Sequence, residues 1–267
     1  YTILKGSDGM LKRKIYDDLL EWNSNPDKVP LIVDGLRQVG KSYIVDKFAH
    51  ENYENVITYD FRHRKELRSI FNGNLDVDSL IEKSFPYFPN DKFIPNKTVL
   101  IFEEIGDCPF ARTSLKSFAL DKRYAVIGTG SLLGVLNYRR KEKIEVPTGY
   151  EKIIHMSSLD FEEFLWANGV DEKAISTLKD YLKQKKELPL ALANFYKGMI
   201  ERYVVIGGMP GSVKEFLKTN NFIKSREYLE GLIKDYRSDF GRFINKDDEE
   251  EVDYSLQAKL NKVFDSI

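Results

Sequence analysis

Apolar and polar positions alternate along the first two thirds of the chain in a way that predicts strands followed by helices. Helix-compatible segments, beginning with 11–22 and 42–50, separate short apolar runs. Such alternation indicates a mostly parallel, doubly wound sheet with helices on both faces. We therefore predict an α/β core at residues 1–157. The strands are predicted at 30–33, 56–59, 98–102, 124–127 and 152–156.

The pattern changes after Met156, where strand-like runs stop and helical periodicity begins. Asp160 and Glu163 have the spacing of a capping box, which marks the start of a helix. We expect an all-helical second domain at 158–267, and the helical pattern at its end leads us to expect a chain that continues beyond Ile267. Further helices are predicted at roughly 171–186, 190–206, 211–218, 222–240 and 249–265.

A glycine-rich motif follows the first predicted strand. Residues 35–42 read Gly-Leu-Arg-Gln-Val-Gly-Lys-Ser and match the phosphate loop G-x-x-x-x-G-K-[ST], also called the P-loop or Walker A motif. Glycines let backbone N–H groups surround phosphates, Lys41 reaches the β and γ oxygens, and Ser42 offers its hydroxyl to Mg²⁺. The residues predicted to bind nucleotide here are Gly35, Leu36, Arg37, Gln38, Val39, Gly40, Lys41, Ser42 and Tyr43.

Two acidic residues end the third predicted strand, where a phosphate loop needs carboxylates. Glu103 would hold Mg²⁺. Glu104 and Lys41 are the predicted catalytic residues, because Glu104 would polarise the attacking water and Lys41 would contact the phosphates. The usual pair is Asp-Glu, so the longer Glu103 puts the metal geometry and the turnover rate in question. The alternative is a surface acidic pair without a catalytic role.

Small hydroxyl residues end the fourth predicted strand, in Gly128-Thr129-Gly130-Ser131. A hydroxyl in this place can sense the γ-phosphate or hold the attacking water. Thr129 is therefore a candidate nucleotide contact and Ser131 a candidate catalytic residue. The alternative is a plain glycine-rich turn.

The ordered series of motifs resembles prokaryotic AAA+ ATPases, in particular the bacterial and archaeal "ATP-binding protein" family related to STAND signalling NTPases. The resemblance implies a P-loop NTPase core with strand order 5-1-4-3-2, a helical lid and a further C-terminal domain. It also implies that Pro210, in Gly208-Met209-Pro210, packs on adenine, whereas alone this tripeptide reads as a helix-start turn. The motifs that carry the resemblance are 35–42, 102–105 with Cys108-Pro109, 128–133, 146–149, 159–165 and 207–210.

The chain departs from the family pattern at two positions, and the sequence does not single out the arginine that would contact the γ-phosphate. Glu103 replaces the usual aspartate, and Gly106 stands where glutamine is common. AAA+ proteins often supply an arginine to a neighbouring subunit's γ-phosphate, for which Arg139 and Arg140 are candidates, with a basic surface turn as the alternative. Arg237 is a second candidate, from the lid.

Composition narrows the classes of function. With 41 Lys and Arg against 42 Asp and Glu, the net charge of −1 gives no support to nucleic-acid binding. The single cysteine, Cys108, excludes an intrachain disulfide, and three widely spaced histidines argue against a zinc site. Residues 245–248 fit the guanine-reading pattern N-K-x-D but lie between helical segments, which argues against GTP. No apolar run reaches the roughly 20 residues of a membrane span, and no signal peptide is evident, so we expect a cytoplasmic protein without a membrane partner.

Two functions of different classes remain from the sequence. In the first, the chain is an ATPase that uses ATP and Mg²⁺, Glu104 activates water, and lid movement drives an attached domain. In the second, it is a signalling switch that holds ADP under the lid and hydrolyses ATP slowly or not at all. The nucleotide is the expected ligand in both, and a homo-oligomer or a protein partner is compatible with either. A nucleic-acid partner, through a DNA-processing or defence effector, rests on family analogy alone.

Overall fold

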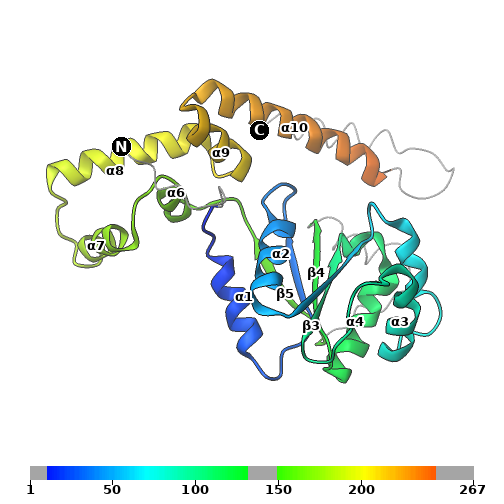
Figure 1. Cartoon of the computed structure of the whole chain (residues 1–267). Helices are drawn as coiled ribbons and strands as arrows, with labels where there is room; N and C mark the ends of the chain where they lie inside the picture. Colours follow the sequence, from blue (N-terminus) through cyan, green and yellow to red (C-terminus); the bar gives the residue numbers. More distant parts are fainter. Residues whose placement is uncertain (1–10, 132–148, 245–267) are drawn as a thin grey trace. The chain divides into compact units, whose positions relative to one another are not determined.

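The computed structural model describes residues 11–131 and 149–244, with side chains as far as Arg237. The chain divides between Glu163 and Phe164 into two compact units. The first contains the sheet and the second is helical, as Figure 1 shows. No helix in the described part of the chain combines the length and apolar character needed to cross a bilayer.

Five parallel strands form the sheet of the first unit, in the order β2-β3-β4-β1-β5 (Figure 1). This confirms the predicted parallel sheet, and the order is the one implied by the family resemblance, read from the opposite edge. The strands are β1 (Leu31–Gly35), β2 (Asn55–Asp60), β3 (Thr98–Glu103), β4 (Ala125–Ser131) and β5 (Lys152–Met156).

Helices cover both faces of this sheet. Alternate residues of β3 point to opposite faces, so Leu100 and Phe102 join the core with α3 and α4 while Val99 and Ile101 face the side where α2 lies. The helical elements of this unit are α1 (Ile15–Ser24), α2 (Lys41–Asn52), η1 (Lys65–Phe71), α3 (Val77–Ser84), η2 (Phe85–Tyr87), η3 (Ile105–Asp107) and α4 (Pro109–Asp121).

Helix α4 was missing from the sequence prediction. Its buried face includes Arg112 and Ser114 as well as Leu115 and Phe118, so the apolar periodicity is interrupted. The Arg112 guanidinium forms a buried ion pair with Glu151, with 2.5 Å between Nη2 and Oε1, which compensates the buried charge. A polar residue on the core face of a helix hides that helix from a search for apolar stripes.

Aromatic rings hold the carboxyl end of β3 in place. Tyr59, Phe61, Phe71 and Phe102 are fully buried and in mutual contact, with ring centroids 5.2 to 6.4 Å apart. Tilted and edge-to-face pairs of this kind each contribute about 0.5–1.5 kcal/mol beyond the burial of their area. This packing makes a rigid support for the acidic residues that follow Phe102.

The helices that follow β5 agree closely with the predicted periodicity. The capping box is present, because the Glu163 N–H donates to the Asp160 carboxylate at 2.9 Å and the Asp160 N–H donates to the Glu163 carboxylate at 3.1 Å. The helix predicted at 249–265 lies outside the described residues. The helices are α6 (Phe161–Ala167), α7 (Glu172–Lys183), α8 (Leu190–Ile206), α9 (Pro210–Thr219) and α10 (Phe222–Ile244).

Candidate nucleotide site

The phosphate loop leaves β1 at Gly35 and enters α2 at Lys41. A Cβ atom on Gly35, whose φ is +145°, would lie 2.1 Å from the Met156 carbonyl oxygen, because β5 is paired to β1 at this point. Gly40 caps α2 in the left-handed region with φ +96°. One glycine is therefore required for space and the other for backbone conformation. Together they let the chain turn tightly from the sheet into the helix N-terminus, where anions bind.

Lys41 is the buried cation of this loop, with 7% of its surface exposed. Its ammonium donates hydrogen bonds to the carbonyl oxygens of Gly35 and Leu36 at 3.0 and 2.8 Å. Burial lowers the pKa of Lys41, although the charges of Glu104 and Asp34 act in the opposite direction. Within the described residues no carboxylate comes within ion-pair distance of this ammonium, so a buried cation is held by neutral oxygens and is available to an anionic ligand.

Carboxylates gather at the carboxyl ends of β2 and β3. Glu103 ends β3 directly opposite Asp60, which ends β2. Burial acts to raise the pKa of Asp60, but hydrogen bonds from His63 and Arg62 outweigh it and lower the pKa. Sequence reasoning missed Asp60, although an acid at the end of a predicted strand was an available signal. Within the described part of the chain no three His, Cys, Asp or Glu side chains are grouped to hold a metal alone.

The two predicted metal ligands, Ser42 and Glu103, suit Mg²⁺ in the way that this ion usually binds together with a nucleotide. Mg²⁺ prefers oxygen ligands and takes many of them from water and phosphates, so a site with few protein carboxylates is suitable. Glu103 is partly exposed at the sheet edge, and Ser42 is exposed in the first turn of α2. Both predicted metal ligands thus present oxygens on accessible side chains.

Glu104 has an unusual backbone and a charged partner. Its φ and ψ are both 51°, in the left-handed region that non-glycine residues rarely adopt. The Glu104 N–H donates to the Thr129 hydroxyl at 3.4 Å, and its carboxylate pairs with Arg62, with 2.9 Å between Nη2 and Oε2. The Arg62 Nε also lies 3.2 Å from Asp107. Arg62 was not predicted from the sequence. The available signal was its position as a cationic residue just after β2, the strand that lies beside β3.

The two hydroxyl candidates lie within β4, which continues through Ser131 instead of ending at Ile127. Thr129 is 1% exposed, and its hydroxyl accepts the Glu104 N–H, so it supports the backbone of the acidic residue. Ser131 is paired with Gly35 in the sheet, which places it beside the first glycine of the phosphate loop. The sheet therefore brings both residues to the edge that carries the loop.

Other predicted contacts belong elsewhere in the chain. Pro210 begins α9 and Arg237 lies in α10, both in the helical unit, so their contact with a nucleotide stays a prediction. Arg139 and Arg140 lie outside the described residues, as does the N-K-x-D segment at 245–248.

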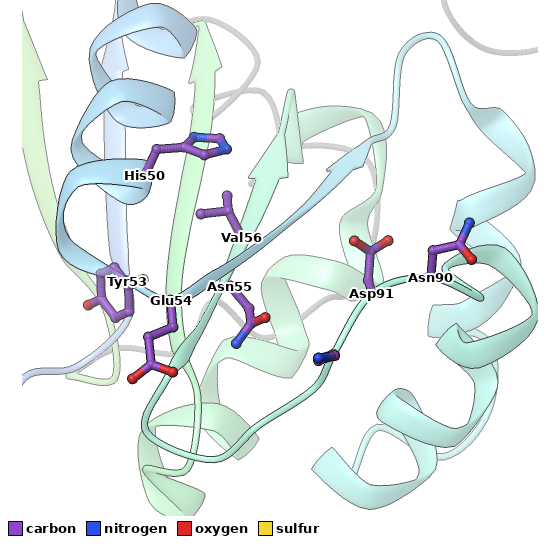
Figure 2. Close-up of a pocket in the computed structure, with 8 residues that line it drawn as sticks. His50, Tyr53, Glu54, Asn55, Val56, Asn90 and Asp91 are labelled. Atoms are coloured by element: carbon purple, nitrogen blue, oxygen red, sulfur yellow. The ribbon is translucent and has the colours of Figure 1, made fainter.

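Two cavities lie at the opposite edge of the sheet. One, of about 360 Å³, is bounded by Tyr53 after α2, Asn55 at the start of β2 and Asp91 ahead of β3, as Figure 2 shows. The other is lined by residues ahead of β1 and at the start of β4, among them Pro30 and Ala125. Because the strands are parallel, these positions mark the amino edge, whereas the phosphate loop follows the carboxyl end of β1. Neither cavity is the predicted nucleotide site.

The chain matches a family model, and its fold is similar to those of solved structures. Residues 27–165 match the family model described as AAA domain. The Walker-type ATPase paby2304 of Pyrococcus abyssi has a TM-score of 0.52 at 17% identity, over 89% of this chain and 77% of that chain. The likeness at this identity shows a shared fold. No curated protein matches the chain.

Two ORC structures from Aeropyrum pernix match with lower TM-scores. The ORC2 protein in ADPNP-ADP complexes gives a TM-score of 0.37 at 12% identity, over 60% of this chain and 49% of that chain. The ORC1 protein in complex with DNA gives a TM-score of 0.37 at 13% identity, over 62% of this chain and 48% of that chain. At these scores the likeness carries no argument about function, and the chain spans about half the length of each.

Proposed function

Because the chain belongs to the AAA domain family, we propose that it is an ATP·Mg²⁺-binding module that hydrolyses ATP to ADP and phosphate. The observation that carries the proposal is Lys41, a buried ammonium at a helix N-terminus that only neutral carbonyl oxygens hold among the described residues. A buried charge without a counter-ion is costly unless a ligand provides the opposite charge. Triphosphate oxygens would provide it.

The main predicted residues at the carboxyl edge would then have the following roles. Lys41 and the N–H groups from Gly35 to Ser42 would hold the β- and γ-phosphates. Mg²⁺ bound with the nucleotide would be held by the Ser42 hydroxyl and the Glu103 carboxylate and would neutralise phosphate charge. Thr129 and Ser131 would lie close to the γ-phosphate.

Glu104 would act as the general base. It would accept a proton from water as the water oxygen bonds to the γ-phosphorus and the bond to the β–γ bridging oxygen breaks, which releases ADP and phosphate. In the structure the Glu104 carboxylate is ion-paired with Arg62. Turnover by this route requires that carboxylate to leave Arg62 and face the water.

The same ion pair supports a second function. A catalytic carboxylate held by Arg62, with Asp107 as a further anchor for the guanidinium, would leave bound ATP or ADP in place. The chain would then act as a nucleotide-loaded switch. Either function would act on other molecules or domains through movement of the lid at residues 158–267. A homo-oligomer, a protein partner or, by family analogy, a nucleic-acid partner would then receive the signal.

Single-turnover hydrolysis separates the two functions. We expect the parent chain, in excess over Mg·ATP, to form ADP, and Glu104→Gln to bind ATP with turnover reduced about 100-fold or more. Glu54→Gln is the matched control, because Glu54 lies at the amino edge and pairs with Lys97. Binding without hydrolysis by the parent would favour the switch, and parent-like turnover by Glu104→Gln would remove the catalytic role of Glu104.

A further inference from the structure

Arg13 is a buried arginine that contacts three separate parts of the first unit. Its side chain is 7% exposed. Nη1 donates to the carbonyl oxygen of Val39 in the phosphate loop at 2.8 Å, and Nη2 donates to the carbonyl oxygen of Ser157, just after β5, at 2.5 Å. Nε lies 3.2 Å from Oε1 of Glu163 in α6. One guanidinium therefore joins the loop, the segment after β5 and the first turn of α6.

The partner carboxylate is equally constrained. Glu163 is 6% exposed, and Oε1 also accepts the backbone N–H of Lys14 at 2.7 Å. Its other oxygen closes the capping box with the N–H of Asp160. A buried charge pair with further hydrogen bonds holds its elements in one geometry, because separating the two charges in the interior is costly. The first turn of α6 is thus held by Arg13 together with the backbone N–H groups of Lys14 and Asp160.

The contact with Val39 has a consequence for the next residue. The peptide unit between Val39 and Gly40 is planar and trans, so its C=O and N–H point in opposite directions. When Arg13 holds the Val39 oxygen, the Gly40 N–H is directed away from Arg13. That N–H belongs to the group that the phosphate-loop motif assigns to phosphate.

We propose that Arg13 is a positioning residue that orients the Val39–Gly40 peptide for phosphate and, through Glu163, links the state of the phosphate loop to α6. Helix α6 runs across the boundary at Glu163 and Phe164, so its first turn belongs to the sheet unit and its end to the helical unit. Phosphate binding at the loop would therefore reach the helical unit through Arg13 and Glu163. This inference rests on nucleotide binding by the phosphate loop.

Trp166 in α6 provides the reporter. The experiment titrates the full chain with ADP and Mg²⁺, measures affinity by calorimetry and follows tryptophan emission with excitation at 295 nm. We expect ADP to change the emission of the parent and not of Trp166→Phe. Arg13→Lys, which keeps the charge but not the fork of donors, should bind ADP about 10-fold more weakly and show no emission change at saturation.

Two further variants separate positioning from general destabilisation. Glu163→Gln should bind ADP within about threefold of the parent and still lose the Trp166 response, because the loop contact of Arg13 is kept while the buried ion pair with α6 is lost. Arg123→Lys is the matched control, an arginine paired with Asp121 and Asp78 that should change neither readout.

The outcomes distinguish this inference from the proposed function. An Arg13→Lys protein with parent-like affinity, a parent-like Trp166 response in Arg13→Lys or Glu163→Gln, or ADP binding by the parent with no change in emission would overturn the inference alone. Trp166→Phe retains Trp22, so the Trp166 response is the part of the parent's emission change that this variant lacks. If Arg13→Lys does not fold, the Glu163→Gln result decides the link to α6. Failure of the parent to bind ADP would overturn the proposed function and this inference together.

Discussion

Lys41 and Arg62 show how single charged residues set the state of the site. Lys41 is buried and held by neutral oxygens, while Arg62 is partly exposed and pairs with both Glu104 and Asp107. The first cation is available to a ligand, and the second occupies the carboxylate that hydrolysis would need. The sequence motif identifies Lys41, whereas Arg62 belongs to no motif and becomes evident only when β2 and β3 are placed side by side.

Removing Arg62 should release Glu104. For Arg62→Gln we expect single-turnover hydrolysis of Mg·ATP to rise about 2- to 5-fold, which corresponds to the loss of a partly exposed ion pair of up to about 1 kcal/mol. Arg64→Gln is the control, because Arg64 pairs with Glu66 on the surface. A fall in the rate for Arg62→Gln alone would mean that Arg62 assists the reaction instead of restraining Glu104.

At the scale of helices and strands, the sequence is informative wherever apolar periodicity and local signals agree. The Asp160–Glu163 capping box and the start of α2 at the phosphate loop were both predictable, because each depends on residues close in sequence. Helix α4 was not, since a buried ion pair interrupts its apolar face. The role of Arg13 was also hidden, because its partners lie far away in the chain.

Glycines in the helical unit offer a test of the packing between α9 and α10. A Cβ on Gly211 would lie 2.1 Å from the ring of Tyr228, whereas a Cβ on Gly231, within α10, meets nothing within 4 Å. We expect Gly211→Ala to lower the free energy of unfolding by about 1–3 kcal/mol and Gly231→Ala to raise it by about 0.5–1 kcal/mol. Denaturant titration followed by circular dichroism measures both, and changes of the same sign would contradict this packing.

At the scale of the whole molecule, the parallel sheet and the helical second part follow from the order of strand-like and helix-like segments. The division between Glu163 and Phe164 separates the phosphate loop from Pro210 and Arg237, so the sheet unit by itself carries the loop, the acidic pair and both hydroxyl residues. Pairing between strands that are far apart in the sequence determines which side chains meet at the site, as when β2 and β3 place Asp60 opposite Glu103. Those contacts depend on which strands are neighbours in the sheet, which apolar patterns alone do not give.

The central claim is that the phosphate loop binds nucleotide through Lys41. Calorimetric titration of Mg·ATP into the parent and Lys41→Ala tests it most directly, with Lys47→Ala as the matched control, since Lys47 lies on the same helix and pairs with Glu51 at the surface. We predict binding by the parent and Lys47→Ala, and an affinity at least about 100-fold lower for Lys41→Ala. Equal affinity in Lys41→Ala, or no binding by the parent, would contradict the claim.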